Sequence, residues 1–171
     1  MSLILPKSPN FDWAGDGQRI VCPCCGCAHP HTEKFRHHME LLQELRTWWG
    51  ASLLVTSGYR CPAYNKKVGG AAKSQHILRR VFGDDTFATD IVAGLPSPRY
   101  DVLSRRTQKQ HYEHWFQAHM TLAEKAKELG FNGIGVYRGD PMKSEEPSIH
   151  LDLREGKFKS WGSDEAKSLG T

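Results

Sequence analysis

Two histidines and one aspartate have the residue types and the settings of a metal site. His76 stands in a polar stretch, whereas Asp90 interrupts the apolar run 87–92. His150 lies in the segment 148–153, where polar and apolar residues alternate. Zinc in a hydrolase takes three protein ligands, usually imidazole nitrogens and carboxylate oxygens, and leaves a fourth position for water. Because bound zinc lowers the pKa of that water towards 7, hydroxide becomes available at neutral pH. The three residues thus indicate a candidate hydrolytic metal centre.

Each of these side chains also has an ordinary structural interpretation. A lone histidine is more often a surface or hydrogen-bonded residue than a ligand. Asp90 alone could cap a turn or pair with an arginine, because a buried carboxylate needs a partner. His150 and Asp152 share one face of the alternating segment, which could be the solvent face of an edge strand. Spacing by itself therefore leaves the metal centre open.

The cysteines form a second group with metal-binding chemistry. Four of the five lie within residues 22–27, and Cys61 stands alone. An odd number crowded in this way is a poor disulfide framework, which favours reduced thiols or a metal. Cys22 and Cys25 have the spacing of a zinc knuckle, which supplies two of the four ligands of a structural site. The candidates to complete such a site are Cys27, His29, His31 and Cys61. Alternatively, the thiols are small buried groups that pack the N-terminal segment onto the turn carrying Cys61.

The elements that must position these residues follow from hydrophobic periodicity and turn signals. An apolar stripe at helical spacing predicts a helix over 32–49, with Thr32 as N-cap and Gly50 as its stop. A second long helix is predicted over 108–129, and a short one over 63–68. Short apolar segments predict strands over residues 52–56, 87–92, 133–137 and 148–153. This order predicts an α+β fold, with helices packed on a small, mostly antiparallel sheet.

Length and composition are those of one ordinary globular domain. The 171 residues suffice for a single sizeable core, with residues 1–31 as an irregular Cys-rich segment and residues 162–171 as a tail. The sequence has no apolar run near the roughly 20 residues that a membrane helix needs. Its start lacks the features of a secretory signal. We therefore expect a monomer that starts in the cytoplasm and has no membrane partner.

The net charge of +4 is a mild basic excess. Because the lysines and arginines are scattered and not interleaved with aromatic residues, we expect no nucleic-acid partner. The charge is compatible with an anionic polymer such as cell wall, and equally with a solvated basic surface. A Cys-rich zinc module that contacts nucleic acid is the rival interpretation from another class. It predicts metal at the cysteines only and salt-sensitive binding.

Several motifs occur in an order that is specific to one family of enzymes. They occupy residues 57–65 (Ser-Gly-Tyr-Arg-Cys-Pro-Ala-Tyr-Asn), 68–71, 74–76 (Ser-Gln-His), 88–91 (Ala-Thr-Asp-Ile), 133–137 and 149–154 (Ile-His-Leu-Asp-Leu-Arg). Taken together, they resemble the zinc D-Ala-D-Ala carboxypeptidase family, metallopeptidase family fifteen, subfamily A. That family includes phage endolysins and shares its fold with the hedgehog signalling domain. The resemblance extends over roughly residues 21–161.

The resemblance implies a role for several residues. His76, Asp90 and His150 would be the ligands of one catalytic zinc ion. Arg60 would stabilise the oxyanion of the tetrahedral intermediate, and Asp152 would be the general base that takes a proton from the zinc water. The positions expected to contact substrate are Tyr59, Ser74 and Gln75. Independently of the resemblance, the structural zinc that the cysteine spacing suggests would involve Cys22, Cys25, Cys27 and Cys61.

Two features depart from the family's usual pattern. His76 and Asp90 are fourteen residues apart, further than is usual, so that residues 78–85 resemble an insertion. The insertion would be a lid, a substrate-selecting loop or a loop that blocks the site, and its Asp84 and Asp85 could compete with Asp90 as ligand. Many relatives place the catalytic acid at the position that is Pro147 here. Two further acidic candidates stand beside it, Glu145 and Glu146.

The sequence therefore predicts a zinc-dependent peptidase that hydrolyses peptide bonds of bacterial peptidoglycan. The bond would be a terminal D-Ala-D-Ala linkage, a stem-peptide bond or a cross-link. A phage or prophage enzyme without a signal would reach the cell wall after the membrane is breached. The alternative is a non-catalytic zinc-binding recognition module of the same fold.

Overall fold

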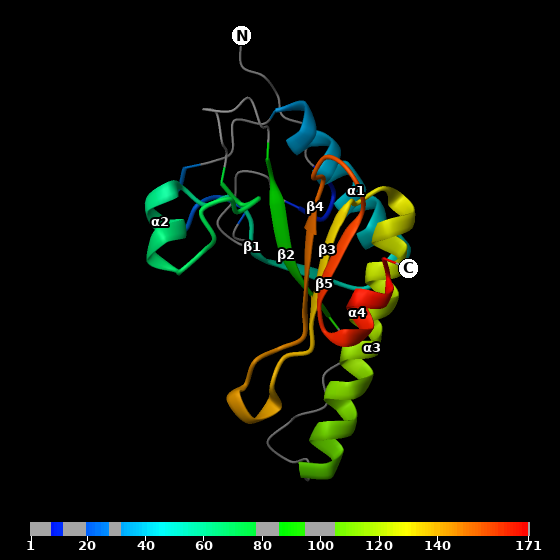
Figure 1. Cartoon of the computed structure of the whole chain (residues 1–171). Helices are drawn as coiled ribbons and strands as arrows, with labels where there is room; N and C mark the ends of the chain where they lie inside the picture. The colour runs from blue at the N-terminus through cyan, green and yellow to red at the C-terminus, as the bar shows by residue number, and fades with distance from the viewer. Residues whose placement is uncertain (1–7, 12–19, 28–31, 78–85, 95–104, 171) are drawn as a thin grey trace.

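The protein is described here by a computed structural model, which covers residues 8–11, 20–27, 32–77, 86–94 and 105–170. Its centre is a five-stranded sheet in the order β1-β2-β4-β3-β5 (Figure 1). The strands are β1 (Leu53–Ser57), β2 (Ala88–Ala93), β3 (Gly133–Tyr137), β4 (Ser148–Asp152) and β5 (Lys159–Gly162). The helices are α1 (Glu33–Trp49), α2 (Pro62–Lys67), α3 (Arg105–Leu129), the 3-10 turn η4 (Pro141–Lys143) and α4 (Asp164–Ser168). The predicted α+β fold is confirmed.

The ends of α1 are set by the residues that the sequence analysis selected. Thr32 accepts a hydrogen bond from the backbone N–H of Phe35 at 3.3 Å, as an N-cap does. Gly50 has a φ of +70°, and its N–H donates to the carbonyl of Arg46. This left-handed conformation is strained for other residues, and it ends the helix where the stripe of buried side chains ends. The helix thus presents one apolar face to the sheet.

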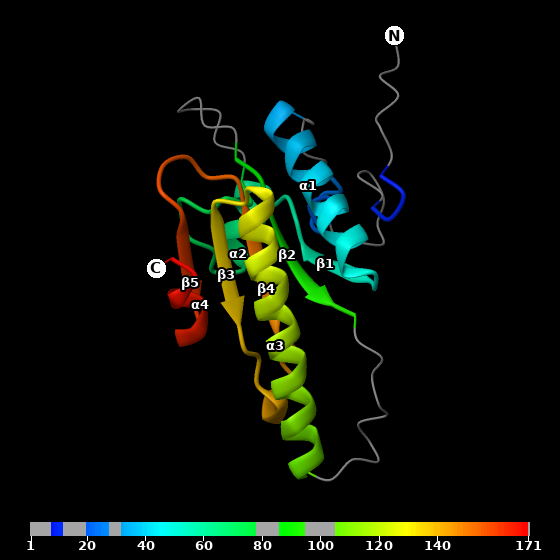
Figure 2. The same cartoon turned by 90° about the vertical axis from the view of Figure 1, so that its right-hand side faces the viewer.

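The two faces of the sheet have different partners. The long helices α1 and α3 lie on the same side of it (Figure 2). The side chains buried between these helices and the strands are aliphatic and aromatic, and they include Phe35, Leu42, Phe116, Leu122, Ile91, Ile134, Ile149 and Leu151. Removal of this apolar surface from water is the main stabilising term of the fold. The opposite face carries Asp90 and His150.

Strand pairing is antiparallel except at one edge, where β5 runs parallel to β3. Between Val55 and Ser57 the pairing of β1 with β2 shifts by one residue, which is a β-bulge. Without the bulge Ser57 would not stand opposite Asp90. The irregularity therefore aims the end of β1 at the polar face of the sheet.

The C-terminal residues form structure where the sequence analysis expected a tail. Residues 162–171 contain α4, whose N-cap is Ser163. Ala166 and Leu169 are buried in the core, and β5 just before the helix adds a fifth strand. The tail prediction is wrong because a five-residue helix is too short to show a hydrophobic period. Its stability comes from tertiary packing.

Within the described residues, no helix combines the length and the apolar character that crossing a bilayer requires.

A buried histidine joins α3 to the sheet. The His119 Nε2 atom accepts a hydrogen bond from the backbone N–H of Ala93 at 3.0 Å, while Nδ1 donates to the carbonyl of Trp115 at 2.7 Å. Both ring nitrogens of neutral His119 are thereby satisfied. Burial lowers the pKa of His119 to about 4, because the charged form would lose its hydration.

His119→Gln is expected to reduce the loss of stability on acidification. The unfolded histidine binds a proton below about pH 6.5 whereas the folded one does so near pH 4, so the wild type loses stability as the pH falls between these values. Between pH 7 and pH 5 the loss due to His119 is about 2 kcal/mol. Urea unfolding at several pH values measures it. His114→Gln, on the exposed side of the same helix, is the control, and equal pH slopes for the two variants would contradict the assignment.

Candidate metal centre

Strand register brings two of the predicted ligands together. Asp90 on β2 and His150 on β4 are directly paired residues of neighbouring antiparallel strands, so their side chains stand on the same face. His76 joins them from the segment after α2. The His150 Nδ1 atom lies 2.9 Å from Asp90 Oδ1, and His76 Nε2 lies 3.3 Å from the same oxygen. The two imidazole nitrogens are 3.2 Å apart.

Hydrogen bonds on the far side of each imidazole ring determine which of its nitrogens faces Asp90 Oδ1. His76 Nδ1 lies 2.7 Å from the carbonyl oxygen of Gly58, which can only accept, so Nδ1 carries the proton. His150 Nε2 lies 2.9 Å from Asp152 Oδ2 and donates to that carboxylate. When both rings are neutral, their unprotonated nitrogens therefore face Asp90 Oδ1. Three lone pairs at such distances repel one another unless a cation lies between them.

The three ligand atoms have the spacing of a tetrahedral zinc site. Bonds of 2.0–2.2 Å to nitrogen and oxygen at tetrahedral angles place ligand atoms about 3.3 Å apart. The observed separations are 2.9, 3.2 and 3.3 Å. Three protein ligands leave a fourth position for water, the arrangement of catalytic sites. Residues His76, Asp90 and His150 thus fit zinc in donor type, orientation and spacing.

The electrostatics of the triad favour a bound cation. Burial alone would raise the pKa of Asp90, but hydrogen bonds and charge from His150 and His76 hold it well below its usual range. Burial would lower the pKa of His150, yet Asp152 and Asp90 raise it. A metal ion at Nδ1 therefore competes with a proton, and its affinity falls as the pH is lowered.

Arg60 lies beside the triad on the turn after β1. Its Nη2 atom donates to Asp90 Oδ2 at 3.2 Å, and its Nε atom donates to Ser57 Oγ at 2.9 Å. The backbone N–H of Arg60 also donates to the carbonyl of His76 at 2.8 Å. The turn therefore fixes the Arg60 guanidinium relative to the carboxylate of Asp90 and to the segment that carries His76.

Asp152 lies behind His150, on the side of the ring away from Asp90. It is fully buried, accepts from His150 Nε2 and accepts again from Arg154 Nε at 2.9 Å. Burial would raise the pKa of Asp152, but the hydrogen bonds from Arg154 and His150 hold it well below its usual range. A carboxylate in this place orients the ligand histidine and increases its basicity. The geometry therefore favours a positioning role for Asp152, where the sequence analysis expected a general base.

A layer of side chains missed by the sequence analysis covers β3 next to His150. The Trp161 ring lies 5.2 Å from the His150 ring, and its Nε1 atom donates to Tyr137 Oη at 2.8 Å. The guanidinium of Arg154 lies 4.5 Å from the centre of the Trp161 ring. Gly135 makes this possible, since a Cβ there would come within 2.5 Å of Trp161 Nε1. The glycines of β3 were the available signal, because a strand-interior glycine often marks close approach.

The triad lines a cleft of about 480 Å³. Its other walls are formed by Thr56, Arg60, Ala71, Lys73, Ser74, Gln75, Tyr137, Ser148, Arg154 and Trp161. Ser74 and Gln75, expected to contact substrate, are thus at the cleft. Tyr59 is not among these walls and packs against the hydrophobic core. A neighbouring hollow shares Tyr137 and Ser148 with the cleft and adds the two acidic candidates Glu145 and Glu146.

Some predicted positions are placed differently or lie elsewhere. The sulfur atoms that gather near Cys22 are those of Cys24, Cys25 and Cys61, so Cys24 takes the place expected for Cys27. The proposed insertion at residues 78–85, with Asp84 and Asp85, lies outside the described residues. His29 and His31 lie outside them as well.

Comparison with known proteins supports the interpretation of this centre. The sequence model of a family described as Peptidase M15 matches residues 17–99, which include His76, Asp90 and Arg60. No curated protein matches the chain. His150 lies beyond the matched segment, and the pairing of β4 with β2 brings it to Asp90.

Asp152→Asn is expected to weaken zinc binding 10–100-fold, because the amide orients His150 less well and makes it less basic. Competition with a chromogenic chelator measures the affinity, and circular dichroism checks the fold. Asp140→Asn, which changes the half-buried N-cap of η4, is the control and should bind zinc like the wild type. Unchanged zinc affinity combined with a large loss of kcat would instead make Asp152 the general base.

Proposed function

We propose that the chain is a zinc-dependent peptidase of the Peptidase M15 family, whose sequence model matches residues 17–99, and that it hydrolyses peptide bonds of bacterial peptidoglycan. The observation that carries this proposal is the convergence of His76 Nε2, Asp90 Oδ1 and His150 Nδ1 within 3.3 Å of one another in an open cleft. When bound there, zinc supplies a Lewis acid that polarises the peptide carbonyl and activates water. The remaining chemistry belongs to the side chains around it.

Arg60 is the group we assign to the substrate carbonyl. Its guanidinium lines the cleft next to Asp90, and its Nε and Nη2 atoms are held by Ser57 and Asp90. A cation preorganised in this way stabilises negative charge that develops on the carbonyl oxygen. Because Ser57 and Asp90 hold the planar guanidinium in place, Arg60 needs little reorganisation as charge develops on the carbonyl oxygen.

The charge of the cleft favours a peptide that carries carboxylates. Three cationic side chains line it, Arg60, Lys73 and Arg154, against one carboxylate, that of Asp90. A bound divalent ion would add to this excess. Stem peptides of peptidoglycan have a free carboxylate at the terminal D-Ala and acidic residues within the stem, so their charge is complementary to the walls of the cleft. This complementarity supports a wall-peptide substrate.

The proton of the attacking water needs an acceptor with access to the cleft. Asp90 is a poor acceptor because its pKa is held low and it is a ligand. Asp152 is engaged by His150 and Arg154. Among the described residues, Glu145 and Glu146 adjoin the cleft through Tyr137 and Ser148. We therefore propose that one of these glutamates accepts the proton and returns it to the leaving amine.

The function is tested by incubating the purified protein with a stem pentapeptide ending in D-Ala-D-Ala and with a cross-linked stem dimer. Mass spectrometry of the products identifies the bond that is cleaved. His150→Ala should lose one zinc ion per chain relative to the wild type, together with all hydrolysis, because a ligand is removed. His37→Ala, on α1 and exposed, is the control. A wild type that binds these peptides and returns them intact would be a recognition module and would contradict the peptidase assignment.

Arg60→Lys is expected to lower kcat/KM on the order of 10²-fold while zinc is retained, since a lysine keeps the charge but loses the fork to Ser57 and Asp90. Steady-state kinetics and zinc analysis on the same sample measure both quantities. Arg138→Lys, whose ion pairs with Glu113 and Glu165 lie outside the cleft, serves as the matched control. Unchanged kcat/KM in Arg60→Lys would exclude Arg60 from transition-state stabilisation.

A further inference from the structure

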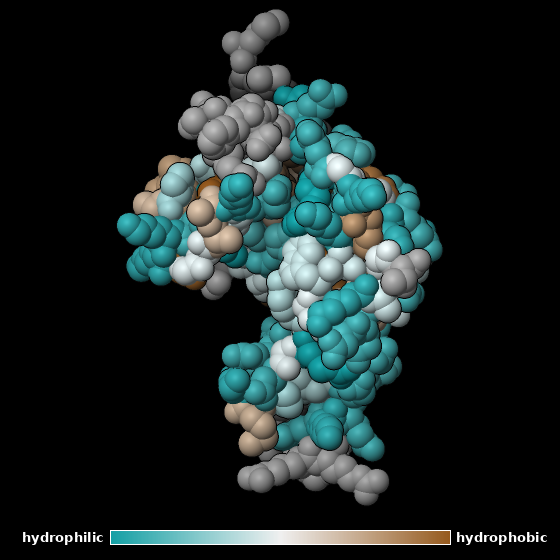
Figure 3. Space-filling model, in the orientation of Figure 1, coloured by the Kyte–Doolittle hydropathy of each residue, from teal (hydrophilic) through white to brown (hydrophobic). Residues whose placement is uncertain are grey.

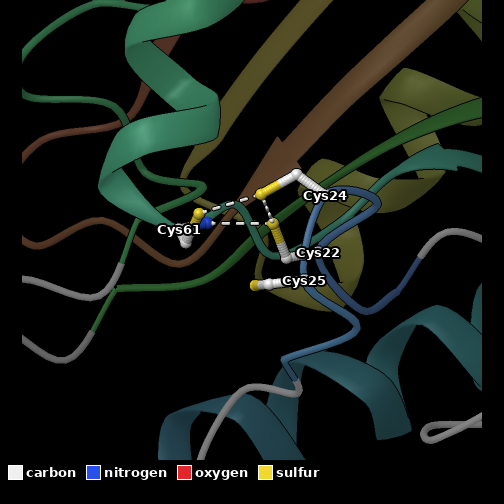
Figure 4. A group of neighbouring side chains, drawn as sticks. All are labelled: Cys22, Cys24, Cys25 and Cys61. Carbon is white, nitrogen blue, oxygen red and sulfur yellow. Dashed lines mark hydrogen bonds between the residues drawn. The ribbon is translucent and has the colours of Figure 1, made fainter.

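Four cysteines from two distant segments gather their sulfur atoms around one space (Figure 4). Cys22, Cys24 and Cys25 come from the N-terminal turn, and Cys61 is the N-cap residue of α2. All four Sγ atoms lie within 4.8 Å of one another. The Cys24 and Cys61 sulfurs are 3.3 Å apart, and those of Cys22 and Cys24 are 3.6 Å apart.

The backbone of the N-terminal turn is built to present these thiols. The N–H of Cys22 donates to the carbonyl of Cys27 at 3.0 Å, and the N–H of Gly26 donates to the carbonyl of Cys22 at 2.8 Å. Gly26 has a φ of +63°, which a side chain would oppose. Cys27 lies beside this group without belonging to it, and its Sγ lies 3.8 Å from the carbonyl oxygen of Cys25.

Backbone amides point at two of the sulfurs. The N–H of Cys61 donates to Cys22 Sγ at 3.3 Å, and the N–H of Tyr64 donates to Cys61 Sγ at 3.4 Å. Hydrogen bonds of this kind, from groups outside the ligand set, orient the ligands of a metal site. The pairs at 3.3 and 3.6 Å are too far apart for an S–S bond of about 2.05 Å. Four thiolates bonded to one zinc at 2.3 Å stand about 3.8 Å apart, which this cluster closely approaches.

We propose that Cys22, Cys24, Cys25 and Cys61 bind a structural zinc ion, separate from the His76, Asp90 and His150 centre. Four thiolates close the coordination sphere, so that no position remains for water and the site has no hydrolytic chemistry. Cys24 and Cys25 are exposed, and zinc also protects such thiols from oxidation.

The cysteine cluster lies next to the turn that carries Arg60 and Gly58, so zinc bound there would stabilise one wall of the cleft. Cys61 directly follows Arg60, and the turn also carries Gly58, which fixes the tautomer of His76. The N–H of Tyr59 donates to the carbonyl of Ile20 at 2.9 Å, just before the Cys-rich turn. The zinc thus fastens residues 20–27 to the turn 57–61 at a second point. Metal binding at the cysteines holds Arg60 and Gly58 in place.

The test measures zinc per chain in a His150→Ala background, so that the Cys site is counted alone and independently of whether the protein is a peptidase. His150→Ala should retain one zinc ion. Cys24→Ser in that background should weaken zinc binding at least 100-fold, because one of four ligands loses its thiolate. Cys27→Ser, in the same turn but outside the group, is the matched control and should retain the ion.

Two further measurements do not depend on folding of the Cys24 variant. Cobalt(II) added to metal-free His150→Ala protein should give the sulfur-to-metal charge-transfer bands of a tetrathiolate site. A mercurial thiol reagent should release the zinc of the native His150→Ala protein in step with modification of the cysteines. Retention of zinc by Cys24→Ser would overturn the proposal. Fewer than five free thiols in the unreduced, denatured protein would overturn it too, since a disulfide would then occupy the cluster.

Discussion

The candidate metal centre depends on one constraint: three ligand atoms whose lone pairs repel one another must be held close together. His76 Nε2, Asp90 Oδ1 and His150 Nδ1 are kept within 3.3 Å by groups that lie outside the triad. The carbonyl of Gly58 fixes one ring, and the carboxylate of Asp152 fixes the other. The fold thus supplies in advance the geometry that a cation needs, which is the usual basis of tight metal binding.

The turn after β1 makes several of the contacts that hold these atoms together. Its backbone contacts the N-terminal segment at Ile20, the segment of His76, and the Cys cluster, all within residues 58–61. The β-bulge before it sets the direction in which the chain leaves the sheet. Because these contacts share one short segment, displacement of any of them would alter both the guanidinium of Arg60 and the ring of His76. Because of this coupling, the structural metal that we propose at the cysteines would also affect the cleft.

The local features of the fold were predictable from the sequence. Periodicity and capping residues located α1 and the long helix α3, and β3 occupies the predicted residues 133–137. The motifs around His76, Asp90 and His150 selected three residues that the structure does bring together, because residue type and local context carry that information. In contrast, β5 and α4 were missed, since the four residues of β5 contain a single apolar side chain, Trp161, and the five residues of α4 are too few to show a helical period.

What the sequence alone determined is which residues have metal-binding chemistry and which elements bear them. Only the tertiary structure decided which atoms meet. Pairing of β2 with β4 placed Asp90 against His150 across sixty residues of chain. It also placed Asp152 behind the ligand ring and Cys24, in place of Cys27, in the cysteine group. The physical reason is that strand register and turn conformation set the direction of each side chain, and both depend on contacts between segments far apart in the sequence.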